Sequence, residues 1–156
     1  MLRIIPYRPE HLQDLKLQPA QSDHVQHLPD PTYAKALAWP EYSITALKGD
    51  QVEACAGLYP CTEKRWYGWS LIGSNLTKRE WVAFSDEIRV HLVKAHMNGV
   101  RRIETIVEAR FEPGIIWAKH LGFKPEGYLR AYSEAGRDCY IFARVMDLPQ
   151  QKEEAA

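Results

Sequence analysis

One long amphipathic helix near the middle of the chain constrains the fold more than any other feature. Between Thr77 and Asn98, apolar side chains recur at three- and four-residue steps, as on one face of an α-helix. Thr77 and Glu80 have the spacing of a capping box at the start of this helix, and Asn98-Gly99 is a typical helix end. Strand patterns at 69–73 and 103–107 flank the helix, which predicts two adjacent parallel strands joined by a helical crossover.

The remaining patterns place a strand, two short helices and a hairpin before this unit, and a helix and a second hairpin after it. We expect strands at 2–6, 42–47, 52–59, 65–75, 101–107, 127–132 and 138–145, and helices at 9–15, 30–39, 77–98 and 113–121. Residues 18–28 are polar and rich in turn formers, so a loop is expected there. The predicted fold class is therefore α/β (α+β, mixed sheet), in the order β-α-α-β-β-β-α-β-α-β-β. A single domain, 1–148, is followed by a polar tail, 149–156.

The composition disfavours several classes of function. Lys plus Arg and Asp plus Glu both number 20, so no net positive charge favours nucleic acid or a membrane surface. No run approaches the roughly 18 apolar residues of a membrane span, and Met1–Pro9 lacks the apolar core of a signal peptide. Three cysteines without a C-x-x-C spacing fit reduced thiols. We therefore expect a cytoplasmic protein that binds neither nucleic acid nor a membrane.

Five segments of the second half carry a family resemblance: His96–Val100, Arg101–Val107, Trp117–Gly127, Tyr128–Arg130 and Asp138–Arg144. A Leu-Gly-Phe run followed by Glu-Gly and a closing hairpin is the usual end of a GNAT chain, and this half resembles the GNAT superfamily of acyl-CoA N-acyltransferases. The resemblance implies that the two central parallel strands splay apart. It also implies transfer of an acetyl group from acetyl-CoA to an amine of a small molecule or a protein.

Three segments of the first half, Ile5–Pro9, Ser43–Leu47 and Ala54–Gly57, suggest a second likeness. They are similar to GNAT-like proteins encoded by short-tailed bacteriophages, some of which are associated with virion assembly rather than with a demonstrated reaction. This resemblance implies an alternative function. In that alternative the chain is a catalytically degenerate GNAT-like protein that acts by contact with a phage or host protein.

The GNAT resemblance implies where acetyl-CoA would bind. Leu71, Ile72 and Gly73 would hold the pantetheine arm beside the first splayed strand. Lys78 and Arg79 would lie near the pyrophosphate, because the N-terminus of a helix favours an anion. The alternatives remain open: 71–73 also reads as an ordinary central strand, and Lys78 and Arg79 as two solvated side chains.

Two positions depart from the family pattern. Trp81 stands where the phosphate-binding loop has glycine, and an indole there would obstruct the phosphates. Ala118 stands where many GNATs have the tyrosine that acts as an acid. We therefore expect acetyl-CoA binding to be weak or lost, and we expect the Trp81 indole to point at the core.

Two candidates remain for proton transfer. Glu108 ends the second splayed strand, where a base would face the cleft, and Tyr132 lies on the closing hairpin, where it would supply a phenol. Each also reads as a solvated side chain. The one metal-like cluster is His24-x-x-His27 with Asp23, and it has no clearly positioned third ligand, so we expect no metal.

Overall fold

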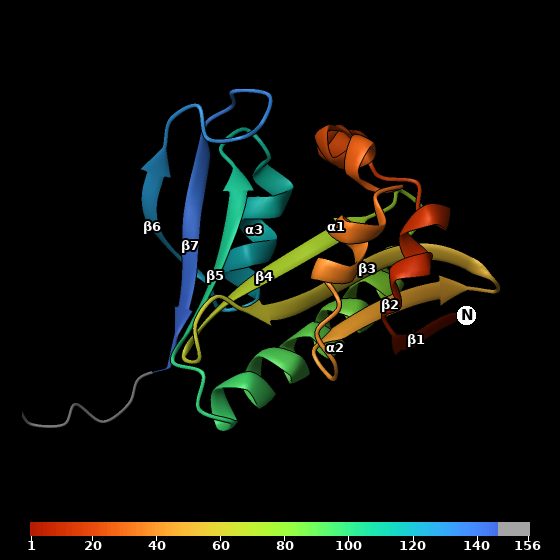
Figure 1. The fold of residues 1–156 in the computed structure, drawn as a ribbon, viewed down its shortest axis with the longest axis horizontal. Coiled ribbons are helices and arrows are strands. Elements are labelled where there is room, and N and C mark those ends of the chain that lie inside the picture. Colours follow the sequence, from red (N-terminus) through yellow and green to blue (C-terminus); the bar gives the residue numbers. More distant parts are fainter. Residues whose placement is uncertain (147–156) are drawn as a thin grey trace, which may run out of the picture.

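The chain folds around one seven-stranded sheet with helices on both faces (Figure 1). The computed structural model describes residues 1–146, so the predicted tail 149–156 and the predicted domain end at 148 lie outside the described residues. The strands are β1 (Leu2–Pro6), β2 (Ser43–Lys48), β3 (Gln51–Pro60), β4 (Arg65–Ile72), β5 (Arg102–Glu108), β6 (Lys124–Leu129) and β7 (Cys139–Val145). Their order in the sheet is β1-β2-β3-β4-β5-β7-β6, and β4 with β5 is its parallel pair.

Helices cover the sheet in two groups. The 3-10 helices η1 (Pro9–Asp14) and η2 (Pro19–His27) lie with α1 (Pro31–Ala36) on one face, and α2 (Lys78–Met97) and α3 (Glu112–His120) on the other (Figure 1). The predicted loop at 18–28 was therefore wrong, since a proline at its start favours the helical turns of η2. Within residues 1–146, no helix is both long and apolar enough to cross a bilayer.

The predicted apolar stripe of α2 is confirmed. Phe84 and Leu92 are fully buried, and Ala95 lies beside them on the same helix face. Burial of a side chain the size of leucine or phenylalanine contributes about 1.5–3 kcal/mol, so this stripe fixes α2 on the sheet. Trp81 packs against the same buried cluster as Phe84, as the sequence predicts.

The parallel strands pair over a short stretch and then part, which confirms the predicted fold class with splayed central strands. Residues 65–67 of β4 pair with residues 102–104 of β5. Beyond that point β4 remains paired with β3 through Ile72, and β5 remains paired with β7 through Glu108. Figure 1 shows the two strands starting side by side and diverging toward their carboxyl ends.

The prediction that Tyr132 lies in a strand of the closing hairpin was wrong. Strand β6 starts earlier than predicted and ends at Leu129, which leaves Tyr132 in the β6–β7 loop. Ala131 has a φ of 50°, a left-handed conformation that interrupts an extended strand. The carboxylate of Asp138 stabilises this turn by accepting the Ala131 N–H at 2.8 Å and the Tyr128 hydroxyl.

The predicted capping box at the start of α2 is confirmed. The Thr77 N–H donates to Glu80 Oε1 at 2.9 Å, and the Glu80 N–H donates to Thr77 Oγ1 at 3.2 Å. Lys48 Nζ lies 3.0 Å from Glu80 Oε1 and ties the helix start to β2. These hydrogen bonds from Thr77 and Lys48 lower the pKa of Glu80 to about 2.

The lowered pKa of Glu80 predicts a pH-dependent contribution to stability. Its stabilising effect is fully present above the unfolded pKa of about 4.3, declines below it, and is lost as the pH falls through the folded pKa. Glu80→Gln should therefore lower the Tm near about pH 7 and lower it clearly less near about pH 2.5, measured by thermal unfolding. Glu87→Gln, at an exposed glutamate of the same helix, is the control. An equal Tm difference at both pH values would contradict this assignment.

Candidate functional site

A cavity of about 170 Å³ opens where β4 and β5 part. Residues 68–70 of β4 and 105–108 of β5 form two of its walls. Helices on one face of the sheet add Ile88 and Trp117, and η2 on the other face adds Gln21 and His24. The cavity is therefore lined from both faces of the sheet, at the gap between its central strands.

Most of the cavity wall is apolar, and one of its polar groups is unpaired. Trp69 exposes 9% of its surface, and its indole Nε1 has no hydrogen-bond partner among the described residues. Gly57 on β3 leaves room for this ring, because a Cβ there would lie 3.0 Å from Trp69 Cε2 and 2.7 Å from the Cβ of Ser43. A buried donor without a partner costs about 1–3 kcal/mol, which an acceptor on a ligand would offset.

The free edge of β4 is covered by η2 and the residues just before it. Gln21 Oε1 accepts the Ile72 N–H at 2.7 Å, and Gln21 Nε2 donates to the Ser70 carbonyl at 2.8 Å. The Gln18 N–H donates to the Ile72 carbonyl at 2.8 Å, and Leu17 forms an isolated antiparallel bridge with Gly73. The backbone groups at this end of the strand are therefore bonded to the chain itself.

The three residues predicted to hold the pantetheine arm differ in where they lie. Ile72 presents its backbone at the edge that Gln21 covers. The Leu71 side chain is buried in the core beneath η1 and α1. The Gly73 N–H donates to the Glu53 carbonyl at 2.8 Å, and a Cβ at Gly73 would lie 2.7 Å from that oxygen. The roles of Leu71, Ile72 and Gly73 in cofactor binding stay a prediction.

The phosphates are predicted to lie at the start of α2. There the Lys78 and Arg79 side chains face solvent, and tryptophan rings pack on the side that faces α3. Lys78 and Arg79 are exposed and do not line the cavity. The rings of Trp81 and Trp117 lie 4.6 Å apart between α2 and α3. Trp117 Nε1 also donates to Ser85 Oγ at 2.9 Å, so the two helices are joined by both a ring contact and a hydrogen bond.

Of the two candidates for proton transfer, the structure brings one to the cavity. Glu108 lines the cavity, and Arg137 Nη1 lies 3.3 Å from its Oε1. The same Arg137 atom is 3.8 Å from Asp23 Oδ2 on η2, so Arg137 links η2 to the end of β5. Tyr132 is 56% exposed and is not part of the cavity wall. Ala118, in the position of the family's tyrosine, is buried in that wall.

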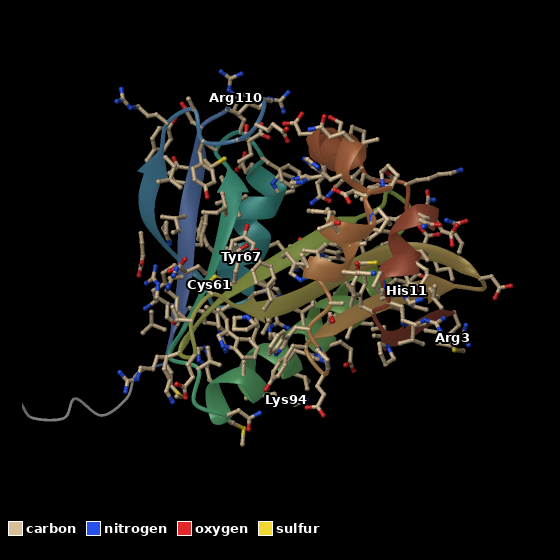
Figure 2. The ribbon with its side chains drawn as sticks, viewed as in Figure 1. Arg3, His11, Cys61, Tyr67, Lys94 and Arg110 are labelled. Atoms are coloured by element: carbon tan, nitrogen blue, oxygen red, sulfur yellow. The ribbon has the colours of Figure 1, made fainter. Side chains whose placement is uncertain are left out.

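Tyr67 places a phenol at the point where β4 and β5 part. The sequence pattern did not distinguish this residue from the other core aromatics. It is the last residue of β4 that pairs with β5, and Figure 2 labels it there. Burial and the neighbouring Tyr59 raise the pKa of Tyr67 far above its ordinary value. The group is therefore a protonated phenol at physiological pH, next to the cavity but not in its wall.

The metal-like cluster of the sequence is engaged in other contacts. His27 Nε2 lies 2.8 Å from Glu134 Oε2 in the β6–β7 loop, and Asp23 faces Arg137. His24 is exposed and contributes to the cavity wall. In the part of the chain that the structure describes, no three His, Cys, Asp or Glu side chains are grouped to hold a metal ion.

Sequence reasoning missed Gln21 and Arg137, which organise the site. Gln21 lies in a polar segment without periodicity, and its partners on β4 are about 50 residues away in the chain. Arg137 lies in a loop, and its carboxylate partners come from η2 and β5. No local pattern signals such contacts, because they depend on the tertiary fold.

The fold is similar to that of N-acetyltransferases of known structure. Ard1 from Thermoplasma volcanium has a TM-score of 0.75 at 15% identity, over 93% of this chain and 97% of its own. Aminoglycoside 6'-acetyltransferase type Ii has a TM-score of 0.70 at 14% identity, over 94% and 99%. The ribosomal-protein-alanine N-acetyltransferase from Brucella melitensis has a TM-score of 0.68 at 15% identity, over 92% and 99%.

A scan against models of protein families found no match, and a search of curated proteins found no similar sequence. The structural likeness confirms that the chain has the fold of GNAT acetyltransferases. At 13–15% identity this likeness shows the fold alone. The similarity of the first half to bacteriophage proteins is not tested by these comparisons and stays a prediction.

The packing of Trp81 gives a stability prediction. Trp81→Gly removes an indole that contacts Trp117 and Phe84, and it adds a flexible residue inside α2. We expect a loss of about 3 kcal/mol in the free energy of unfolding, measured by urea denaturation. Val82→Gly, at an exposed neighbour in the same helix, controls for the glycine alone and should cost about 0.5 kcal/mol. Equal losses in the two variants would show that the indole contributes nothing to packing.

Proposed function

We propose that this chain is an acyl-CoA-dependent N-acetyltransferase that transfers an acetyl group to an amine. The cavity between β4 and β5 carries the proposal, since it is lined from both faces of the sheet and has the Glu108 carboxylate in its wall. A thioester approaching from the α2–α3 face and an amine approaching from the η2 face would meet in this cavity. The fold shared with known N-acetyltransferases supports this arrangement.

Each proton of the transfer needs a partner. The new N–C bond forms as the C–S bond of the thioester breaks, the amine loses a proton and the leaving thiolate gains one. Glu108 is proposed as the base that takes the amine proton, with Arg137 holding its carboxylate in place. Tyr132 is proposed as the phenol that gives a proton to the leaving thiolate. This role requires the β6–β7 loop to move Tyr132 closer to the cavity.

The residues present would hold acetyl-CoA poorly. The capping box uses the Thr77 and Glu80 N–H groups and places a carboxylate at the helix start, where it repels phosphate. Trp81 and Trp117 fill the gap between α2 and α3. Lys78 and Arg79 remain as exposed cations near that helix start.

Acetyl-CoA should therefore bind with a Kd above about 100 μM, equivalent to less than about 6 kcal/mol. Titration calorimetry of the full chain measures it. If the phosphates lie near Lys78 and Arg79, charge reversal of both residues to glutamate should weaken binding further and reduce its salt dependence. A low-micromolar complex of the unmutated chain would contradict the proposed weak binding, and unchanged affinity in the double variant would contradict its location.

The role of Glu108 gives a catalytic prediction. Glu108→Gln should lower the rate of acetyl transfer about 100-fold and leave the acetyl-CoA affinity unchanged, because only the base is lost. Release of the free CoA thiol with a panel of primary amines measures the rate. Glu112→Gln, at an exposed glutamate of α3, is the matched control. A rate in Glu108→Gln equal to that of the control would remove Glu108 from the mechanism.

A second candidate function is favoured by the groups that fill the site. With the β4 edge bonded to Gln21 and the helix gap closed by Trp81 and Trp117, the chain also fits a GNAT-like protein that works by protein contact alone. Its partner would be a phage or host protein. The same titration separates the two candidates. The protein-contact candidate requires that no binding of acetyl-CoA is detected up to millimolar concentrations.

A further inference from the structure

We propose that residues 17–27 form a latch that closes the cavity from within the chain, with Gln21 in the place of a ligand amide. The proposal rests on the proposed function, because it concerns access to the same cavity. It assigns Gln21 as the contact that must open before an amide-bearing ligand, such as the pantetheine arm of an acyl-CoA, can pair with β4.

The two hydrogen bonds of Gln21 are those that an amide makes at the edge of a sheet. Its Oε1 accepts the Ile72 N–H and its Nε2 donates to the Ser70 carbonyl, at 2.7 Å and 2.8 Å. An unpaired strand edge presents such N–H and C=O groups in a row and pairs with any extended amide of matching spacing. The Gln21 side chain is thus a single amide unit bound to an edge that can pair with a longer one.

Apart from Gln21, the latch is anchored at its start by the Gln18 N–H bond to the Ile72 carbonyl and by the Leu17–Gly73 bridge, whereas its helical part, η2, is held weakly. None of the nine residues of η2 is buried, so little apolar surface fixes the helix to the sheet. Its other contacts include the ion pairs of Asp23 with Arg137 and of His27 with Glu134, both at the surface, and the ring contact of His27 with Tyr33. Exposed ion pairs contribute little to stability, and a segment without buried contacts opens at low free energy.

Opening the latch would change the cavity itself. Gln21 and His24 are both part of the cavity wall, so movement of η2 away from the sheet widens the entrance on that face. It also frees the Ser70 carbonyl and the Ile72 N–H. Ligand binding and latch closure therefore compete for the same backbone groups, and each weakens the other.

The test compares Gln21→Ala with Gln26→Ala, which changes the same residue type at an exposed position of η2. The first readout is hydrogen exchange at the Ile72 amide, measured by NMR without ligand. Gln21→Ala should speed this exchange about tenfold, and Gln26→Ala should leave it unchanged. The second readout is titration with acetyl-CoA, for which Gln21→Ala should bind about tenfold more tightly than the unmutated chain.

The outcomes separate the latch from the proposed function. Unchanged exchange at Ile72, or faster exchange without tighter acetyl-CoA binding, overturns the latch. Tighter binding by Gln21→Ala without acetylation of any amine keeps the latch and overturns the acetyltransferase. If Gln21→Ala does not fold, Gln21→Met removes the same hydrogen bonds while keeping the length of the side chain, and the same two readouts apply.

Discussion

The early end of pairing between β4 and β5 is the constraint on which the rest of the structure depends. After Tyr67 and Glu104, each strand follows its other neighbour, β3 or β7. The backbone groups on the facing edges then need other partners, because a buried N–H or C=O without one is costly. Thr105 Oγ1 supplies one by donating to the Gly68 carbonyl at 2.9 Å, and Gln21 supplies two more further along β4. The cavity and the groups that cover it thus have the same origin.

The elements that the sequence predicts well are those fixed by local chemistry. The start of α2 follows from Thr77 and Glu80, and its buried face follows from the spacing of Phe84 and Leu92. The splay of β4 and β5 was predictable only through a family resemblance, because strand periodicity says nothing of where pairing ends. Among the candidate site residues, Glu108 lies in the cavity wall as expected of the end of β5.

The features that the sequence could not predict depend on contacts between distant residues or on rare backbone geometry. Ala131 adopts a positive φ that its residue type does not suggest, and this moves Tyr132 from a strand to a loop. Helix η2 has no buried side chain, so it carries no apolar period to read. Gln21 gains its role from hydrogen bonds to a strand that follows it by some 50 residues.

The two groups proposed to close the site are held by different kinds of contact. The Trp81–Trp117 pair is apolar and packed on the core, and it is tied across the helices by Ser85, so separating it requires loss of packing. The Gln21 contact is polar and lies in a segment without buried side chains, so it can exchange for equivalent bonds to a ligand or to water. Under the proposed function, the phosphates of acetyl-CoA would meet a helix start that packing keeps closed, whereas the β4 edge would exchange Gln21 for the amide of a ligand. The proposed low affinity and the proposed latch therefore rest on separate parts of the chain, so a substitution in one is expected to leave the other unchanged.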